Sequence, residues 1–169
     1  MPVDRDRYRA LCGAFPTGVT IATTVDATGA PKGLTTQSFI GLSTEPPLML
    51  VAVDKTSRTL SALRHTQKFV INFLKLGSEE ISTLFASKAA NKFRGFTWDA
   101  SSIAGGAPIL RDNVVAFAEC VVVQTIEAGD HFIFVASVEG GELLGGIPLM
   151  YYQRTYAPWP KEEPTPPIG

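Results

Sequence analysis

Hydrophobic and polar positions change over short intervals along most of the chain, a pattern that indicates strands more than long helices. The segment Leu48–Val53 is apolar at every position, which predicts a strand buried on both faces. Turn-forming residues at 26–29 and 128–130 predict tight connections between neighbouring strands. Further strands, rich in β-branched or apolar residues, are predicted at 19–25, 32–36, 38–43, 68–74, 114–126, 131–138 and 149–156.

Three segments have helical periodicity. In the first, Tyr8, Leu11, Cys12 and Phe15 form one apolar stripe over residues 4–15. The second is expected from a cap at Thr56 or Ser57 through Arg64, and the third from a cap at Ser78 through Phe85. Residues 87–106 are expected to form a loop, and the glycine-rich segment 140–146 a turn. About seven strands, mostly in hairpins, with three helices predict a mainly β fold, an antiparallel barrel with flanking helices outside.

Composition limits the function classes. The 169 residues suit a single domain, expected over 1–157, followed by a Pro-rich extended C-terminal tail at 158–169. A net charge of −1 gives no general attraction to nucleic acid or to anionic membranes. No apolar run reaches the length of a membrane-spanning helix, and the charged first residues do not resemble a secretory signal. The two distant cysteines favour a reducing, cytoplasmic location over a disulfide scaffold.

Several chemistries are not supported by any motif. The two histidines, His65 and His131, show no metal-ligand spacing, and the cysteines form no CxxC pair, so a metal site is not expected. The sequence contains no GxSxG elbow, no Walker A loop and no GxGxxG fingerprint. A serine hydrolase site, a P-loop site for nucleoside triphosphates and a Rossmann-type dinucleotide site are therefore not predicted.

Four polar segments could carry chemistry. Residues 33–39 place hydroxyls and an amide between two strands, where they could bind the edge of a planar heterocycle or simply form strand and turn. Residues 54–59 offer hydroxyls and cations at an expected helix start, which suits a phosphate but also an ordinary N-cap. Residues 86–94 carry three cations that could close over a phosphate or remain a solvated loop. His131, at the mouth of a hairpin, can donate, accept or stack, or can be a surface histidine.

Taken in order, these segments resemble the flavin reductase family, which has the split-barrel FMN-binding fold, an antiparallel Greek-key-like barrel. This family includes the small reductase components of two-component flavin-dependent monooxygenases. The resemblance covers about residues 5–157. The matching pieces are Phe15–Thr20, Thr35–Phe39, Pro46–Leu48, Asp54–Ser57, Asn91–Phe93, Gly129–His131 and Arg154–Tyr156.

The resemblance implies a homodimer with flavin in a groove near the subunit interface. It places Thr17 and Gly18 near the flavin ring and His131 beside the nicotinamide. The residues that it implies along the ring and ribityl chain are Thr35, Thr36, Gln37 and Ser38. Those that it implies around the phosphate are Asp54, Lys55, Thr56, Ser57, Lys92 and Phe93. The chain departs from the family at Gln37, where many members carry a small residue or asparagine.

The expected activity is that of an NAD(P)H:flavin oxidoreductase, which reduces FAD or FMN and supplies reduced flavin to a partner monooxygenase. The flavin carries the redox chemistry, which explains why no acid–base dyad or triad is found. One alternative is a flavoprotein that keeps its flavin and acts on a small molecule. Another is a flavin-binding module without turnover. The sequence leaves open FAD against FMN and NADH against NADPH.

Overall fold

The structure is a computed structural model, and it describes residues 1–158. Its centre is a seven-stranded sheet in which every neighbouring pair is antiparallel, with the order β3-β2-β6-β9-β10-β5-β4. The strands are β2 (Thr20–Val25), β3 (Pro31–Thr36), β4 (Phe39–Thr44), β5 (Pro47–Asp54), β6 (Lys68–Leu74), β9 (Val114–Ala128) and β10 (His131–Leu143). The mainly β, antiparallel fold is therefore confirmed.

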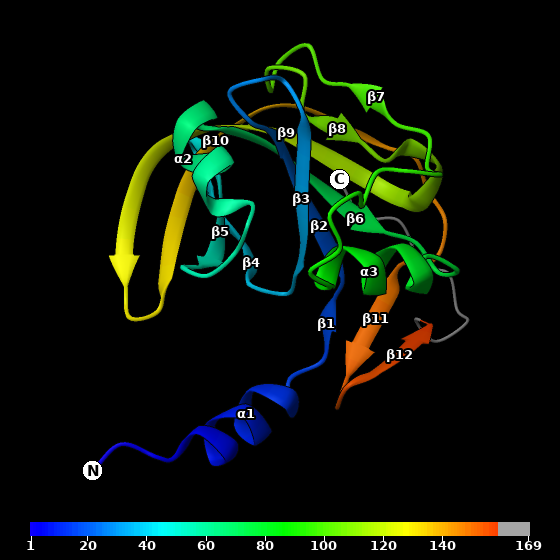
Figure 1. Cartoon of the computed structure of the whole chain (residues 1–169). Coiled ribbons are helices and arrows are strands. Elements are labelled where there is room, and N and C mark those ends of the chain that lie inside the picture. The colour runs from blue at the N-terminus through cyan, green and yellow to red at the C-terminus, as the bar shows by residue number, and fades with distance from the viewer. Residues whose placement is uncertain (159–169) are drawn as a thin grey trace.

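This sheet curls into a barrel that is split between its two edge strands (Figure 1). The edge strands β3 and β4 are consecutive in the chain, joined by Gln37 and Ser38, yet they are not paired with each other. The amide of Ala52 in β5 donates to the carbonyl of Ser38 (2.9 Å), so the corner between β3 and β4 is tied to the far edge of the sheet. The split therefore places residues 37 and 38 at the opening of the barrel.

The barrel interior is filled by apolar side chains. Val51, Phe69, Ile71 and Phe134 of the strands are fully buried, and Leu63 of the following helix packs into the same cluster from outside. Burial on this scale is the main source of stability for such a domain. A buried asparagine, Asn72, joins β2, β6 and the segment 108–110: its side-chain NH₂ donates to three oxygens and its Oδ1 accepts from the amide of Leu110 (2.8 Å).

The helices lie outside the barrel. In helix α2 (Leu60–Thr66), the side chains of Leu60, Ala62 and Leu63 are buried against the barrel. Helix α3 (Glu79–Ala86) packs against β3. Phe85 of α3 lies so close to Gly33 that a Cβ at Gly33 would be 2.7 Å from the Phe85 ring. Glycine at this position is what lets α3 approach the strand.

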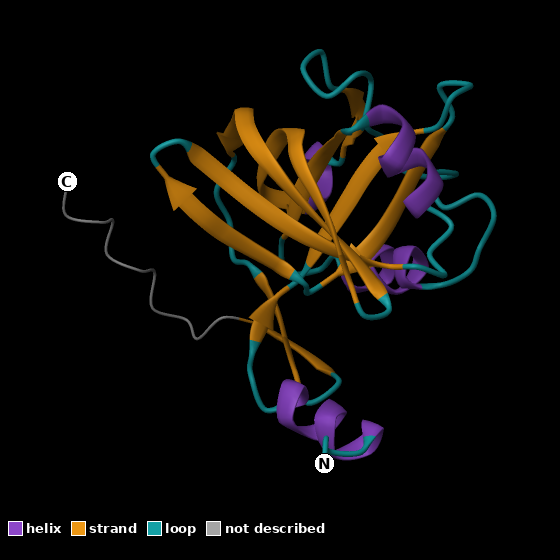
Figure 2. Cartoon of the chain, turned by 90° about the vertical axis from the view of Figure 1, so that its left-hand side faces the viewer, coloured by secondary structure: helices purple, strands orange, loops and turns teal. Residues whose placement is uncertain are grey.

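A second, smaller unit of structure extends from the barrel (Figures 1 and 2). It consists of a three-stranded sheet, β1 (Thr17–Gly18), β11 (Leu149–Tyr152) and β12 (Thr155–Pro158), and of helix α1 (Arg5–Gly13). None of the residues of α1 is buried, although its apolar stripe has the predicted spacing. The remaining elements are the strands β7 (Asp99–Ala100) and β8 (Pro108–Ile109) and a 3₁₀ turn, η1 (Arg111–Asn113).

Five expectations about the elements need correction. The final strand is a hairpin, because Gln153 and Arg154 adopt positive φ and reverse the chain between β11 and β12. The second helix begins at Leu60 after Thr59 and not at a cap formed by Thr56 or Ser57. Ser78 precedes α3, but its hydroxyl donates to the carbonyl of Asn113 and makes no side-chain cap.

The other two corrections concern β7 and the glycines. The segment 87–106 is not only loop, since it includes β7, which pairs with β8. Gly140 and Gly141 lie inside β10 at a bulge, so only the later part of the glycine-rich segment is a turn. Of the expected C-terminal tail, Pro158 ends β12, and the rest lies outside the described residues.

Candidate functional site

The opening of the barrel is a groove with a volume of about 1270 Å³. It lies between β1, the β3–β4 corner, β5, β9 and β10, and it is apolar over most of its wall. Side chains of the outer face of β5 line it, whereas Val51 and Val53 of the same strand point into the buried core. The apolar side chains on its wall include Phe15, Phe39, Met49, Leu50, Ile133 and Leu143.

This arrangement corrects the expectation for Leu48–Val53. The strand is apolar on both faces because one face lines the buried core and the other lines the groove. Leu50 and Ala52 are only half-buried for that reason, whereas Met49 lies on the same face as Val51, packs against the core and also reaches the groove. The continuous apolar run of residues 48–53 indicates a strand with two apolar faces. The run alone does not show whether the second face is buried in the core or lines a binding groove.

Polar side chains gather at one corner of the groove, formed by Thr17, Gln37 and Ser38, which we call the polar corner. The side-chain amide of Gln37 donates to the hydroxyl of Thr17 (Nε2 to Oγ1, 2.9 Å) and so joins the β3–β4 corner to β1. Gly18 follows Thr17 in the wall of the groove. Four of the predicted site residues therefore meet at one place.

The hydroxyls of Thr35 and Thr36 do not face the groove, which corrects the expectation that they would line it together with Gln37 and Ser38. The hydroxyl of Thr35 donates to the carbonyl of Ser82 in α3 (2.6 Å), and that of Thr36 accepts from the amide of Ser38 (3.0 Å). Both side chains thus satisfy backbone groups and shape the corner.

The turn after β5 differs from the predicted phosphate cradle. Asp54 accepts hydrogen bonds from the amide and the hydroxyl of Thr56 (both 2.6 Å), and these bonds lower the pKa of the Asp54 carboxyl. The amide of Ser57 donates to the carbonyl of Asp54 (2.9 Å). The amides expected to be free for a phosphate are therefore already bonded, and the cations Lys55 and Arg58 are what this turn offers an anion.

Two of the predicted cationic segments do lie side by side. The guanidinium of Arg58 donates to the carbonyl of Lys88 (2.6 Å), which ties the turn after β5 to the loop after α3. The ammonium of Lys92 donates to the carbonyls of Phe85 (2.6 Å) and Gly33 (3.3 Å), and burial together with the charge of Arg58 lowers its pKa. Phe93 packs edge-to-face on Phe85, with ring centroids 4.8 Å apart.

His131 stands at the start of β10, directly opposite Asp54 in the antiparallel register. Its Nδ1 lies 2.6 Å from a carboxylate oxygen of Asp130, and the hydrogen bond and charge of His131 lower the pKa of Asp130. His131 is half-buried and lies outside the wall of the groove, but Ile133, two residues along the same strand, lines it. The structure thus places His131 beyond one end of the groove.

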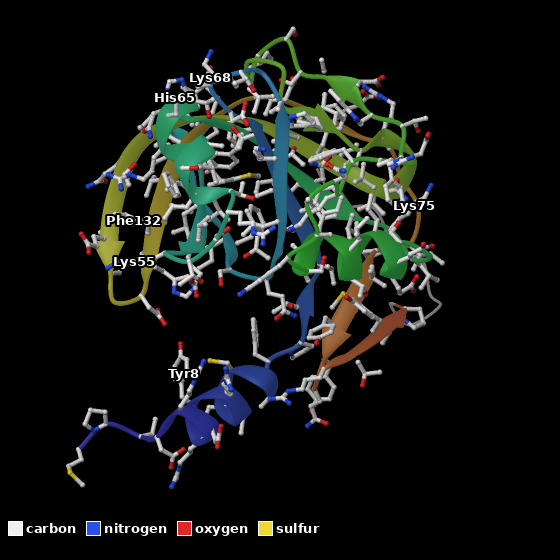
Figure 3. All side chains as sticks on the ribbon, in the orientation of Figure 1. Tyr8, Lys55, His65, Lys68, Lys75 and Phe132 are labelled. Carbon is white, nitrogen blue, oxygen red and sulfur yellow. The ribbon has the colours of Figure 1, made fainter. Side chains whose placement is uncertain are left out.

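Surface contacts join the turn after β5 to the exposed end of the β9–β10 hairpin. Lys55 forms an ion pair with Glu127 (2.6 Å) and lies over the ring of Phe132, 5.6 Å from its centroid. Figure 3 shows Lys55 and Phe132 together on this edge of the barrel, with Tyr8 rising from α1 below it. Phe132 itself packs against the buried core, whereas its neighbour Ile133 lines the groove. Sequence reasoning did not identify Ile133, because an apolar strand residue gives no signal that distinguishes a groove wall from a core.

The fold and the groove define a class of protein. An open barrel with a large apolar groove and a few polar groups at one corner is suited to a planar heteroaromatic ligand. Residues 12–160 match the model of the flavin reductase like domain. The chain belongs to the flavin reductase family.

Similar proteins span nearly the whole chain. A flavin reductase (NADH) of Kitasatospora aureofaciens is 42% identical over 163 residues, covering 95% of this chain and 85% of that protein. The structure of a homologue of nitrilotriacetate monooxygenase component B from Mycobacterium thermoresistibile has a TM-score of 0.89 at 35% identity, covering 98% of this chain and 92% of that chain. An NADH:FAD oxidoreductase of Streptomyces globisporus, in complex with NAD and FAD fragments, has a TM-score of 0.87 at 28% identity and covers 94% of each chain.

Within residues 1–158, no helix is both long enough and apolar enough to cross a membrane.

Proposed function

We propose that this protein is an NAD(P)H:flavin oxidoreductase that transfers a hydride from the nicotinamide to FAD or FMN and supplies reduced flavin to a partner monooxygenase. The observation behind this proposal is the match to a flavin reductase (NADH) over 95% of the chain. The similarity to a monooxygenase component and to an NADH:FAD oxidoreductase supports NADH, FAD and an oxygenase partner as the first choices.

The groove fits a flavin on physical grounds. A flavin ring is planar and apolar on its faces, and a wall such as Met49, Leu50 and Ile133 can pack against it. The polar corner supplies hydrogen-bonding groups for one edge of the ring. When bound, the flavin supplies the hydride acceptor, so the protein itself needs no acid–base dyad.

The remaining roles follow from position. We assign Thr17, Gly18, Gln37 and Ser38 to the ring, with Thr35 and Thr36 holding the backbone of that corner. We assign the flavin phosphate to the region where residues 54–57 meet Lys92 and Phe93. Arg58 joins these two segments through its bond to Lys88 and adds a cation there.

We assign His131 to the nicotinamide. The carboxylate of Asp130 accepts a hydrogen bond from Nδ1 and orients the ring, which leaves Nε2 for the substrate. Hydride transfer requires the nicotinamide carbon to lie at about 3–3.5 Å from the flavin nitrogen. We therefore assign to His131 the role of holding the nicotinamide at this distance from the flavin.

The direct test is anaerobic. Purified protein is mixed with NADH and an excess of FAD or FMN in separate cuvettes, and the loss of flavin colour is followed. We expect many equivalents of flavin to be bleached per protein, faster with FAD. Bleaching of only one equivalent indicates a flavoprotein that keeps its flavin, and no bleaching indicates a binding module without turnover. The same assay with NADPH compares the two nicotinamide donors.

The variant His131→Ala tests the nicotinamide assignment. Loss of one hydrogen bond to the substrate is expected to lower kcat/KM for NADH about tenfold, or about 1.4 kcal/mol, with the flavin Kd nearly unchanged. The control is His65→Ala, at the exposed end of α2, which is expected to leave both constants unchanged. Loss of flavin affinity with unchanged dependence on NADH would overturn this assignment.

We also propose a cytoplasmic homodimer. Both cysteines are free thiols, Cys12 exposed and Cys120 buried, which suits a reducing compartment. Apolar side chains of α1 and the end of β10 are exposed in the single chain, with Leu143 89% exposed. A second copy of the chain is the proposed cover for these surfaces.

A further inference from the structure

The groove has few polar side chains, and most of those are already occupied. The hydroxyl of Thr20 donates to the carbonyl of Thr36 (2.7 Å), and Glu142 forms an ion pair with Arg111 (2.7 Å). Among the described residues that line the groove, this leaves the polar corner of Thr17, Gln37 and Ser38 as the place where side chains can bind a ligand edge. In an otherwise apolar site, such groups fix the orientation of the ligand.

Within the polar corner, the hydrogen bond to Thr17 orients Gln37. One N–H of the amide is used by Thr17 (2.9 Å), which restrains the direction of the amide and leaves its carbonyl oxygen available to a ligand. The two residues come from different elements, β1 and the β3–β4 corner, so the tether also fixes one wall of the groove relative to the other. The amide therefore presents one acceptor and one remaining donor in a set direction.

The pyrimidine edge of a flavin has a matching pattern. It carries an N3–H donor between two carbonyl acceptors, and an amide can pair with a donor and a neighbouring acceptor at the same time. We propose that Gln37 recognises the pyrimidine edge of the flavin through its side-chain amide, and that Thr17 is a positioning residue that orients this amide. The inference rests on the proposed function, because it names the part of the flavin that this corner binds.

The test uses two probes that differ at one atom. Lumiflavin has the free N3–H, and 3-methyllumiflavin has a methyl group in its place. Binding of each to the full chain is measured by equilibrium dialysis. The wild-type protein is expected to bind lumiflavin about tenfold more tightly, because methylation removes the donor and crowds the amide.

Four proteins are compared. Gln37→Ala is expected to reduce the tenfold preference to about twofold or less. Thr17→Val, which keeps the shape of the side chain but removes the hydroxyl, is expected to lose most of the preference as well. Thr17→Ser keeps an acceptor for the amide and is expected to retain the preference. The melting temperature of each protein, measured separately, reports whether the fold is intact.

The outcomes separate this inference from the proposed function. If the wild-type protein binds neither probe, the flavin site itself is wrong. If it binds lumiflavin but Gln37→Ala keeps the full preference, the function stands and the role of Gln37 is refuted. If Thr17→Val behaves as Thr17→Ser does, the tether has no positioning role.

Discussion

At the scale of the single residue, Asp26 shows how one side chain fixes a turn. Its carboxylate accepts from the amide of Thr28 (2.9 Å), the hydroxyl of Thr28 (2.6 Å) and the amide of Ala30 (3.0 Å), and it pairs with Lys32 (3.1 Å). The hydroxyl of Thr28 is the largest contribution, and together these contacts lower the pKa of Asp26 far below its usual value. The turn chemistry was predictable from the sequence because all partners lie within six residues.

A pH-dependent loss of stability is expected from this turn. Because the folded-state pKa of Asp26 is lowered, its contribution is complete above the unfolded pKa of about 3.9 and is lost as the pH falls below it. Asp26→Asn is therefore expected to lower Tm by a few degrees at pH 7 and by less at pH 3. Thermal unfolding by circular dichroism measures both, with Glu45→Gln, an exposed carboxyl without such contacts, as the matched control. An equal effect of Asp26→Asn at both pH values would contradict the argument.

The two thiols are expected to react very differently. Burial, with a further contribution from Glu119, raises the pKa of Cys120 to about 12, whereas Cys12 is exposed on α1. The thiolate is the reactive species, so Cys120 is expected to be inert in the folded protein. Titration with an aromatic disulfide reagent at pH 8, at a protein concentration low enough to leave the α1 stripe uncovered, should modify one thiol per chain in a fast phase and two after unfolding in denaturant. Cys12→Ser should remove the fast phase, and a fast phase that persists in this variant would show that Cys120 is accessible.

Local competition limits what residue patterns can predict. The positions of Thr56 and Ser57 fit a helix cap. However, the amide of Thr56 donates to the carboxylate of Asp54, which forms a turn here, and the helix begins only at Leu60. Gln37 could be named as a site residue because it lies between two strand patterns. Its bond to Thr17 could not, because those residues are 20 positions apart and meet only when the barrel forms.

At the scale of elements, the hairpins with turn-forming residues were predictable, whereas the β11–β12 hairpin and the irregular strands were not. The turns at 26–29 and 128–130 define their strands through local chemistry. The glycines at 140 and 141 resemble turn residues, but here they let β10 pass close to β9 at a bulge. A Cβ on Gly141 would lie 2.5 Å from the carbonyl oxygen of Phe117, a backbone atom that cannot easily move.

The substitution Gly141→Ala is therefore expected to destabilise the protein by about 1–3 kcal/mol, as overpacking against backbone does. Because Gly141 also lines the groove, the flavin Kd is expected to rise. Gly41→Ala in β4 is the matched control, since nothing lies within 4 Å of the added Cβ, and it should cost less than about 0.5 kcal/mol. Urea unfolding followed by fluorescence measures both variants. If Gly141→Ala and Gly41→Ala have equal free energies of unfolding, β9 and β10 can move apart at the bulge without loss of stability.

At the scale of the whole molecule, the sequence pattern predicts an antiparallel barrel, but it does not show where the barrel opens. Closure depends on which edge strands pair, and β3 and β4 stay apart even though they are neighbours in sequence. The position of the groove is a consequence of that gap. The apolar stripe of α1 has the same character: its spacing predicts a helix, but none of the residues of α1 is buried in the single chain.

The exposed stripe of α1 leads to a prediction about assembly. Tyr8, Leu11 and Phe15 are 60%, 61% and 73% exposed in one chain, and a helix with this stripe in water gains stability only when it is covered. We expect a mass of about 36 kDa by light scattering, twice the 18.2 kDa of the chain. Leu11→Glu places a charge in the stripe and is expected to shift the protein to the monomer. Ala10→Glu introduces the same charge on the opposite face of α1 and is expected to leave the dimer intact, so a dimer that survives both substitutions would show that α1 lies outside the interface.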